Sequence, residues 1–414
     1  MRIVFLSPSG ELGGAETALV DMLAAIRAAR PEWTLATIAA SDGPLIRKAG
    51  AYSETIVLPF PNALARLGEW GTRGSVSTRV GLGAGFVAAS GPALGYARHL
   101  KRHLLDFHPD IIHSNGLKMH LLGARVQPPG AKLIWHFHDY PAARRMTAAL
   151  LASQAHRCDA MLANSESVAA EARARFGAIV PLHTVYNAVD LERFAPSGPR
   201  VDLDALAGLP PLAPGGVRVG LVATFARWKG HTVFLDALAK LRMNGPPEGG
   251  PSRGVANVRG YIVGGSIYHT GASQHTLELL RAQARVRGLG DAVGFTGTVD
   301  DVPGVMRALD VVVHASIEPE PFGLVIAEAM ACGRPVIVSR AGGAAEIAQG
   351  GAVFHKPGDS AELAERIREL ASDPARREAL GDAGRAVAMR LFSRERLCAT
   401  LMPVYESLAR SARS

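Results

Sequence analysis

Residues 318–339 read Glu-Pro-Glu-Pro-Phe-Gly-Leu-Val-Ile-Ala-Glu-Ala-Met-Ala-Cys-Gly-Arg-Pro-Val-Ile-Val-Ser, and three kinds of local structure follow one another in this stretch. Its first six residues favour a loop, because the two prolines and the glycine are poor in a helix interior. Leu324–Cys332 is rich in helix formers and is followed by glycine and proline, which predicts a helix that ends there. Val336–Ser339 is a short apolar run and predicts a buried strand.

This pattern places two glutamates differently, with Glu320 on the loop and Glu328 inside the helix. After the strand, Arg340–Glu346 contains a glycine pair and predicts a turn that opens a second helix. Glycine turns at helix starts leave backbone N–H groups free for a diphosphate, whereas carboxylates accept hydrogen bonds from sugar hydroxyls. The combination suggests a nucleotide-sugar site. The alternative is a half-buried helix with one solvated glutamate and one capping glutamate.

The same stretch resembles the signature of glycosyltransferase family four, which comprises retaining enzymes of the two-domain GT-B fold. In that signature two glutamates flank seven residues and Pro-Phe-Gly follows the first glutamate, as it does here. The resemblance extends upstream through 294–301 and 308–316 and downstream to Glu346. It implies that Glu320 contacts the donor sugar and that Glu328 holds the ribose hydroxyls. To the same donor site we assign Phe322, Gly323 and Leu324, with Gly264 and Val299 near the base.

Length and composition limit the classes of protein to consider. A chain of 414 residues with 48% hydrophobic content predicts two or three packed domains. The formal charge of +8 favours an anionic partner, but no aromatic-basic interleaving or zinc-type spacing accompanies it, so we expect no nucleic acid. The three cysteines are odd in number and widely spaced, which fits a reducing cytosol. Met1–Pro8 reads as a buried strand rather than a signal peptide, and we expect a cytoplasmic protein.

Apolar runs alternate with helical stretches along the chain, which predicts α/β structure with parallel sheets. In the first half the predicted strands lie at 3–6, 35–38, 111–113, 133–138, 160–163 and 182–185. In the second half they lie at 217–224, 260–265, 292–295, 311–314 and 336–339. The Pro- and Gly-rich stretch 196–216 separates the two series, and 244–257 reads as an insertion loop.

We therefore expect two doubly wound Rossmann-like domains, 1–196 and 197–393, that face a central cleft in the GT-B architecture implied by the resemblance. Ligands of such sheets bind outside the carboxyl ends of the strands. The first domain is expected to bind the acceptor and the second the nucleotide-sugar donor. Leu397 and Leu401 are spaced as on a helix, and the resemblance implies that a helix at 394–414 crosses back onto the first domain.

Two cations and two glycines are expected to contact the donor diphosphate. Arg227 and Lys229 follow a predicted strand and precede the helical stretch 233–241. The resemblance implies that both face the diphosphate, where they would also stabilise the departing nucleoside diphosphate; the alternative is an ordinary cationic loop. Gly13 and Gly14 form a turn after the first strand, and the resemblance places such a pair against the diphosphate. Their spacing is not that of the dinucleotide-binding fingerprint.

His138 is the predicted catalytic histidine. It ends a predicted strand on the same side as His136. The resemblance implies a histidine, often followed by Asp as Asp139 follows here, near the donor sugar's hydroxyl and anomeric centre. The alternative is a structural histidine, with Asp139 capping the next helix. His113 and the pair that begins at Asn164 end neighbouring strands and are candidates for the acceptor side.

We expect no metal and no cofactor. The one conspicuous Asp-x-Asp element, at 202–204, falls in the predicted linker. With Arg227 and Lys229 in place of a cation, the sequence predicts metal-independent transfer. The resemblance implies that an acceptor hydroxyl attacks the anomeric carbon from the face that the nucleotide leaves, with retained configuration. Glu320 and His138 would orient the sugar and support the charge that develops on it.

Residues 80–97 carry no charge and are long enough for a membrane span to be considered. They contain many glycines and alanines, a serine, a proline and little leucine or isoleucine, so we expect no span. Between positions 61 and 105, six basic residues accompany a single acidic one, Glu69. This favours a surface segment on anionic lipid and a glycan or lipid-linked acceptor, with an internally packed helix as the alternative.

Two other functions remain open. A sugar-nucleotide epimerase shares the GT-B architecture and would form product without an acceptor, whereas a nucleotide-sugar-binding module would not catalyse at all. The Pro-Phe-Gly signature argues against the first, and the presence of Glu320, Arg227 and His138 argues against the second. The sequence leaves the donor base, the hexose and the acceptor open.

Overall fold

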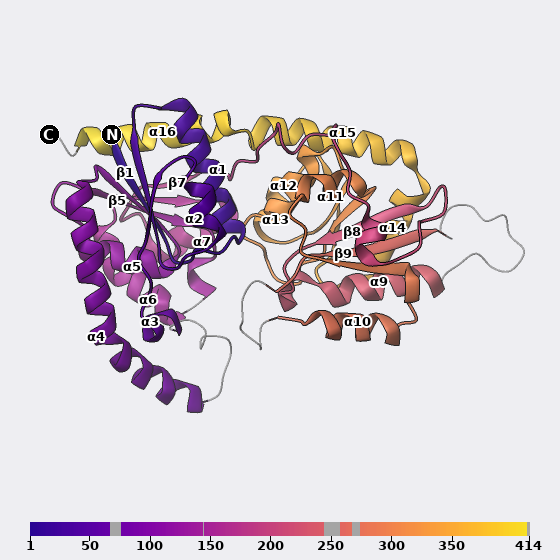
Figure 1. The fold of residues 1–414 in the computed structure, drawn as a ribbon, viewed down its shortest axis with the longest axis horizontal. Coiled ribbons are helices and arrows are strands. Elements are labelled where there is room, and N and C mark those ends of the chain that lie inside the picture. The colour runs from indigo at the N-terminus through magenta and orange to yellow at the C-terminus, as the bar shows by residue number, and fades with distance from the viewer. Residues whose placement is uncertain (67–75, 144, 244–256, 267–273, 412–414) are drawn as a thin grey trace, which may run out of the picture. The chain divides into compact units, whose positions relative to one another are not determined.

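A computed structural model describes residues 1–66, 76–143, 145–243, 257–266 and 274–411, so the predicted insertion loop at 244–257 falls almost wholly outside the described residues. The chain forms two compact units. Unit 1 comprises Met1–Ala188 and Arg394–Ser414, and unit 2 comprises Val189–Ser393. Each unit is a parallel sheet with helices on its faces, which confirms the predicted α/β fold class (Figure 1).

Unit 1 contains a seven-stranded parallel sheet in the order β3-β2-β1-β4-β5-β6-β7. Its strands are β1 Arg2–Ser7, β2 Thr34–Ala39, β3 Glu54–Val57, β4 Ile111–Asn115, β5 Lys132–Phe137, β6 Ala160–Ala163 and β7 Leu182–Thr184. Its α-helices are α1 Gly14–Ala29, α2 Pro44–Ala49, α3 Asn62–Arg66, α4 Val76–Phe107, α5 Leu117–Val126, α6 Arg145–Gln154, α7 Glu166–Phe176 and α16 Arg394–Ser411. The strand order reverses between β1 and β4, and sheets of this kind bind ligands at such a switch point.

Two apolar layers cover the sheet of unit 1. On one side, Phe5 and Ile111 are fully buried against α1, α2 and α16. On the other side, Leu133 is fully buried in a layer that includes Leu100 of α4 and side chains of α5, α6 and α7. Each such large apolar side chain contributes about 1.5–3 kcal/mol through burial. The polar groups at the strand ends are thus held by a well-packed frame.

The C-terminal helix α16 packs within unit 1, although it follows unit 2 in the chain. Its Arg394 pairs with Asp21 of α1 at 2.7 Å, and its Glu406 pairs with Arg30 at 2.9 Å. Leu401 is fully buried in the same apolar layer as α1. The helix therefore supplies part of the core of unit 1.

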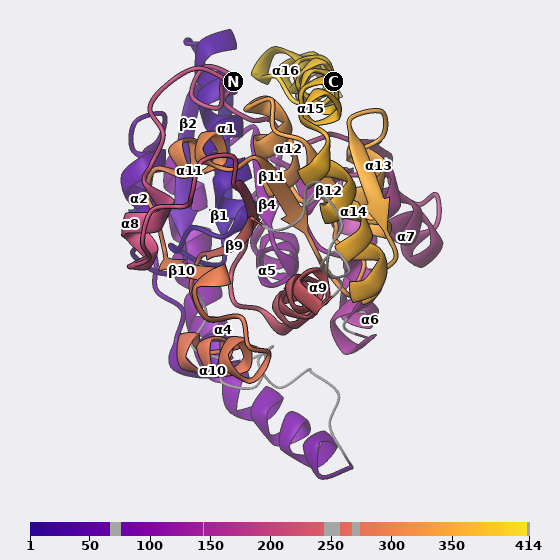
Figure 2. The same cartoon turned by 90° about the vertical axis from the view of Figure 1, so that its right-hand side faces the viewer.

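Unit 2 has the same strand order with six parallel strands, β10-β9-β8-β11-β12-β13. Its strands are β8 Val217–Val222, β9 Val258–Val263, β10 Val293–Gly297, β11 Val311–His314, β12 Val336–Ser339 and β13 Ala352–His355. Its α-helices are α8 Leu203–Ala207, α9 His231–Met243, α10 Leu277–Val286, α11 Val302–Ala308, α12 Leu324–Ala331, α13 Gly342–Ile347, α14 Ser360–Ser372 and α15 Pro374–Leu391. Figure 1 and Figure 2 show α9 and α10 on one side of this sheet and α11 and α12 on the other.

The border between the units lies at Ala188 and Val189, earlier in the chain than the predicted position at 196–197. The residues after Val189 stay with unit 2 because arginines of that unit hold their carbonyl groups. Arg307 donates to the carbonyl of Pro199 at 2.7 Å, and Arg385 donates to that of Phe194 at 3.0 Å. The Pro- and Gly-rich stretch is therefore part of a domain and contains α8.

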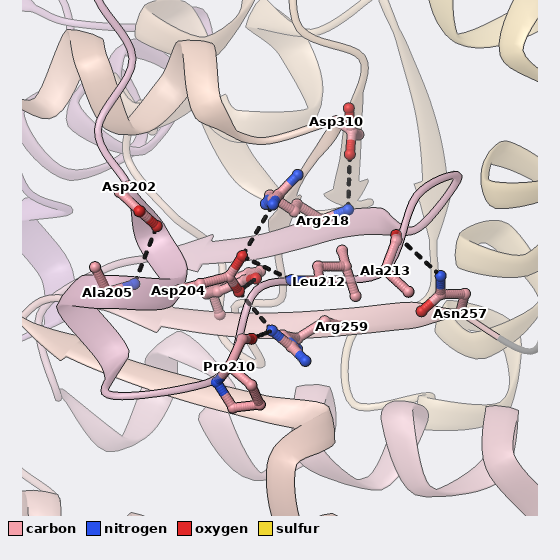
Figure 3. A network of polar contacts seen from close by, with 11 residues as sticks. Asp202, Asp204, Ala205, Pro210, Leu212, Ala213, Arg218, Asn257, Arg259 and Asp310 are labelled. Carbon is pink, nitrogen blue, oxygen red and sulfur yellow. Dashed lines mark hydrogen bonds and ion pairs between the residues drawn. The ribbon is translucent and has the colours of Figure 1, made fainter.

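Asp204 on α8 fastens this stretch to the amino-terminal parts of β8 and β9 (Figure 3). Its carboxylate accepts hydrogen bonds from Arg218 at 2.9 Å, from Arg259 at 2.6 Å and from Tyr261 at 2.5 Å. Asp202 caps the amino terminus of α8. Both carboxylates of the Asp-x-Asp element thus have structural partners.

Among the helices of the described residues, none is both long enough and apolar enough to span a bilayer.

Candidate functional site

The candidate site of unit 2 lies at the carboxyl ends of β8 and β11, where the strand order reverses. Strand β8 leads into a short 3₁₀ helix, η4, at Arg227–Lys229, and β11 leads into the loop that carries Glu320. The structure brings two of the predicted residues into contact, because Lys229 Nζ lies 2.5 Å from Glu320 Oε1. The carboxyl ends of neighbouring parallel strands thus hold a cation against a carboxylate.

Two glycines allow the segments at this edge of the sheet to approach one another closely. Gly230 has a φ of +75°, and a Cβ there would collide with the carbonyl oxygen of Ala315, just after β11. Gly264 has a φ of +136°, and a Cβ there would collide with the carbonyl oxygen of Ala223, just after β8. The turn that carries Lys229 is thereby seated against the end of β11.

Glu320 is only 7% exposed, and protein groups contact both of its carboxylate oxygens. While Lys229 donates to Oε1, the Nε2 atom of His314 lies 2.6 Å from Oε2 and the hydroxyl of Ser316 donates to Oε2 at 2.8 Å. Glu320 also pairs with Gly342, at the start of α13, in a parallel bridge. These contacts fix the position of the carboxylate.

The ionisation of Glu320 follows from the same contacts. Burial alone would raise its pKa, but the charge of Lys229 and the interaction with His314 outweigh burial and hold the pKa well below its ordinary range. The group is therefore a carboxylate at neutral pH. A carboxylate only accepts hydrogen bonds, which matches the hydroxyl groups of a sugar.

His314 and Ser316, which contact Glu320, were not predicted from the sequence. They belong to a larger group at one edge of the sheet, since Ser339 donates to the carbonyl of Ser316 at 2.6 Å and His355 Nε2 lies 3.2 Å from the carbonyl of His314. These four residues end or follow β11, β12 and β13. A histidine and a serine directly after the apolar run of β11 were the signal that could have identified the first two.

Four other predicted donor-site residues lie in the loop and helix after Glu320. Phe322 is 3% exposed, and its ring packs edge-on against Phe392 with centroids 5.6 Å apart, so it belongs to the core. Gly323 caps α12 with a φ of +88°. Leu324 begins α12 and Glu328 lies inside it, and both are partly buried.

The remaining predicted donor contacts lie at the same edge of the sheet. Arg227 is exposed, and its guanidinium has no hydrogen-bond or ion-pair partner in the described part of the chain, so this group is available to a ligand. Gly264 directly follows β9, and Val299 follows β10. Across the ranges that the structure describes, no three His, Cys, Asp or Glu side chains are grouped so that they could hold a metal ion.

In unit 1, Gly13 and Gly14 lie at the start of α1, directly after the loop from β1. The N–H of Gly13 donates to Glu16 Oε2 at 3.1 Å, whereas the space beside Gly14 is open. Burial raises the pKa of Glu16 to about 7 against the opposing effect of its backbone hydrogen bonds, and Asp139 adds to the rise. A proton on Glu16 would remove a negative charge that disfavours phosphate at this turn.

His138 lies directly after β5, and its ring centroid is 4.0 Å from that of His136. Its Nε2 atom lies 2.9 Å from Asn115 Oδ1 at the end of β4. His136 contacts His113 at 3.1 Å, and His113 contacts the hydroxyl of Tyr405 on α16 at 2.6 Å. Burial lowers the pKa of His138 to about 4, so the ring is neutral at pH 7.

Asn164 and Ser165, which the sequence placed near the acceptor, follow β6. The hydroxyl of Ser165 accepts the N–H of Val168 at 3.1 Å and caps α7, which is a structural role. Asn164 is 2% exposed, and its Oδ1 atom has no hydrogen-bond donor in the described part of the chain.

Comparison with known proteins identifies the family. A model described as Glycosyl transferases group 1 matches residues 213–387, and one described as Glycosyltransferase Family 4 matches residues 12–193. A phosphatidyl-myo-inositol mannosyltransferase of Mycobacterium leprae is 34% identical over 51% of this chain and 53% of its own length. A D-inositol 3-phosphate glycosyltransferase of Streptomyces bingchenggensis is 31% identical over 62% of this chain and 54% of its own length. The chain spans about half the length of these curated relatives.

Solved structures agree on the fold. Anabaena HepE, solved in complex with UDP-glucose, has a TM-score of 0.77 and 25% identity, over 98% of this chain and 100% of that chain. Sucrose-phosphate synthase from Thermosynechococcus elongatus has a TM-score of 0.77 and 21% identity, over 99% of this chain and 100% of that one, and supports the fold alone. With one family model on each half of the sequence and two doubly wound units, this chain belongs to the group 1 glycosyltransferases and has the GT-B fold.

Proposed function

We propose that this protein is a glycosyltransferase that moves a hexose from a nucleotide-diphosphate sugar to a hydroxyl group of a glycan, a lipid-linked sugar or a small molecule. The observation that carries the proposal is the buried pair of Lys229 and Glu320 at the switch point of unit 2. An exposed cation, Arg227, lies on the same turn. This combination of cations and a hydrogen-bond acceptor matches a diphosphate joined to a sugar.

In this proposal, unit 2 binds the donor. Arg227 and Lys229 neutralise the diphosphate, and each charge-assisted hydrogen bond contributes about 1.5–3 kcal/mol. The same cations stabilise the negative charge on the departing nucleoside diphosphate, so they affect turnover as well as binding. Glu320 accepts hydrogen bonds from hydroxyls of the sugar and orients it.

Unit 1 supplies His138, which is neutral at pH 7 and can accept a hydrogen bond from a substrate hydroxyl. We propose that the acceptor hydroxyl attacks the anomeric carbon from the face that the nucleotide leaves, with retained configuration. The leaving phosphate oxygen takes the acceptor's proton, and no protein nucleophile takes part. The two cations of unit 2 make a metal ion unnecessary.

The named relatives suggest which substrates to try first. HepE was solved with UDP-glucose, so a UDP-sugar is the first donor. The names of the two curated relatives include an inositol phosphate and a phosphatidyl-inositol, so a phosphorylated polyol and its lipid form are the first acceptors.

The proposal is tested by screening the purified protein for thermal shift with UDP-, GDP- and ADP-sugars, followed by nucleotide-release assays with and without acceptor. We expect nucleoside diphosphate release that depends on the acceptor, a product whose anomeric configuration by NMR matches the donor, and full activity in EDTA. Glu320→Gln should lower kcat more than nucleotide affinity. Turnover without an acceptor would instead identify an epimerase, and binding without turnover a binding module.

We further propose that α4 brings unit 1 to anionic lipid. In its described carboxyl-terminal half, Arg98, Lys101 and Arg102 are exposed together with Leu94 (52%) and Leu105 (43%). Changing the three cations to glutamine should abolish flotation with vesicles that contain anionic lipid while leaving soluble-acceptor kinetics unchanged. Flotation that does not depend on anionic lipid content would contradict this proposal.

A further inference from the structure

Buried polar side chains form a line through unit 1 from α16 to the end of β5. Tyr405, His113 and His136 are all 0% exposed. The hydroxyl of Tyr405 lies 2.6 Å from His113 Nδ1, and His113 Nε2 lies 3.1 Å from His136 Nδ1. Within the described residues, the other nitrogen of His136, Nε2, has no hydrogen-bond partner. The line therefore ends in one unpaired buried nitrogen.

Counting protons decides the direction of the hydrogen bonds in this line. If Tyr405 donates to His113 Nδ1, the proton of His113 is on Nε2 and is donated to His136 Nδ1, so His136 also carries its proton on Nε2. In the opposite direction the phenolic O–H has no acceptor, and His136 Nε2 is left as a bare acceptor. The first direction leaves one buried group unpaired and the second leaves two, which favours the first about tenfold or more.

The neighbouring histidine, His138, has an unpaired nitrogen of the opposite kind, an acceptor. Asn115 turns its carbonyl oxygen Oδ1 toward His138 Nε2 at 2.9 Å; in this orientation Nε2 carries the proton and Nδ1 is left with a lone pair. This Nδ1 atom is inaccessible to solvent and has no partner in the described chain. The ring centroids of His136 and His138 are 4.0 Å apart. One unpaired donor and one unpaired acceptor thus lie on adjacent rings.

We propose that Tyr405 is a positioning residue of the unit 1 site: through His113 it fixes the Nε2–H tautomer of His136, so that His136 and His138 present a donor and an acceptor to a hydroxyl group of a sugar or polyol substrate. A hydroxyl both donates and accepts, which makes it the matching ligand group. Burial keeps the line neutral, because it lowers the pKa of His113 to about 3 and that of His136 well below its ordinary value. The identity of the ligand rests on the proposed function, whereas the tautomers do not.

The tautomers can be read from ¹⁵N shifts of the ring nitrogens in full-length protein labelled on histidine. At pH 7 we expect His113 and His136 to carry their protons on Nε2. Tyr405→Phe removes the hydroxyl that sets the direction, so both rings should shift toward a mixture of tautomers. The control is Tyr52→Phe, because Tyr52 packs against the same apolar layer and its hydroxyl has no hydrogen bond in the described chain.

Two results would overturn the positioning role. One is a wild-type spectrum with the proton of His113 on Nδ1, which needs no variant and so does not depend on whether Tyr405→Phe folds. The other is a folded Tyr405→Phe protein in which both rings keep the wild-type tautomers. Either result leaves the proposed transferase function untouched.

The hydroxyl contact is tested by adding glucose, with sulfate as the anionic control. Glucose should move the signals of His136 Nε2 and His138 Nδ1, and sulfate should not. If neither signal moves, the substrate contact is refuted. With the donor found in the activity screen, Tyr405→Phe should lower kcat/KM about two- to tenfold, the range for one neutral hydrogen bond, while Tyr52→Phe should not.

Discussion

Replacing Lys229 by methionine is expected to destabilise unit 2 by about 3 kcal/mol at pH 7. The side chains of Lys229 and Glu320 are 16% and 9% exposed and their charged atoms lie 2.5 Å apart, so the change leaves a buried carboxylate without its counter-charge. Removing one partner of a buried ion pair costs about 3–5 kcal/mol. We expect the lower end of this range, because His314 and Ser316 still contact Glu320 Oε2 at 2.6 and 2.8 Å.

The pH dependence of this loss has a definite sign. In the wild type, Lys229 and His314 hold the pKa of Glu320 below the ordinary value of a glutamate, so the carboxylate stabilises the folded state above that ordinary value and this contribution is lost as the pH falls. In Lys229→Met the pKa of Glu320 rises, and the folded variant takes up a proton as the pH falls. The difference in unfolding free energy between variant and wild type should therefore narrow below about pH 5.

Urea denaturation followed by circular dichroism and fluorescence measures these free energies. Trp228 reports on unit 2, because it belongs to that unit, and it lies beside Lys229, whose Nζ is 4.0 Å from its ring centroid. The double variant Lys229→Met with Glu320→Gln removes both charges and should recover about 2 kcal/mol relative to the sum of the single losses. The control is Lys240→Met on the exposed side of α9, with an expected change within about 0.5 kcal/mol. If Lys229→Met costs no more than the control, the buried pair does not stabilise the fold as argued.

Three further predictions concern other parts of the site and its frame. Arg227→Ala should weaken UDP binding about tenfold in calorimetry without changing unfolding free energy, whereas Arg242→Ala, another exposed arginine, should change neither. Asp204→Asn should lower the unfolding free energy by about 3 kcal/mol in urea denaturation and leave UDP affinity unchanged. A loss of UDP affinity would contradict the structural role of Asp204. Burial lowers the pKa of His231 to about 3, so as the pH falls from 6.5 the unfolded chain protonates this histidine before the folded protein does, and the folded protein loses stability. His231→Gln should therefore lose about 2 kcal/mol less unfolding free energy than the wild type between pH 6.5 and 5. Equal losses in both proteins would refute the lowered pKa.

The fold class and most strands were readable from the sequence because the buried strands are continuous apolar runs. The prediction missed β3 and β13, which lie at the edge of each sheet and are only partly buried, so they lack that signal. The border between the domains was also misplaced. Proline and glycine suggested a linker, whereas side chains distant in sequence, Arg307 and Arg385, hold that stretch in unit 2.

Residues of the candidate site could be selected from the sequence where a local motif contains them. Glu320 and Lys229 stood out because each lies in a short stretch with distinctive neighbours, yet their mutual contact joins positions 91 apart in the sequence. The contact between His113 and Tyr405 spans 292 positions, and nothing local to either residue signals it. Similarly, Glu16 reads from sequence as an ordinary first-turn acid of a helix, and its raised pKa depends on burial and on Asp139.

The close approaches at Gly230 and Gly264 limit what laboratory evolution of this protein can change. A combinatorial library aimed at new sugar preferences would naturally randomise the loops around Arg227, but any side chain at either glycine meets a neighbouring carbonyl oxygen. Clones altered there would fail as misfolded proteins rather than as enzymes with new selectivity. Randomisation is better directed at Thr224, Ala226 and Val299, which are partly exposed to solvent.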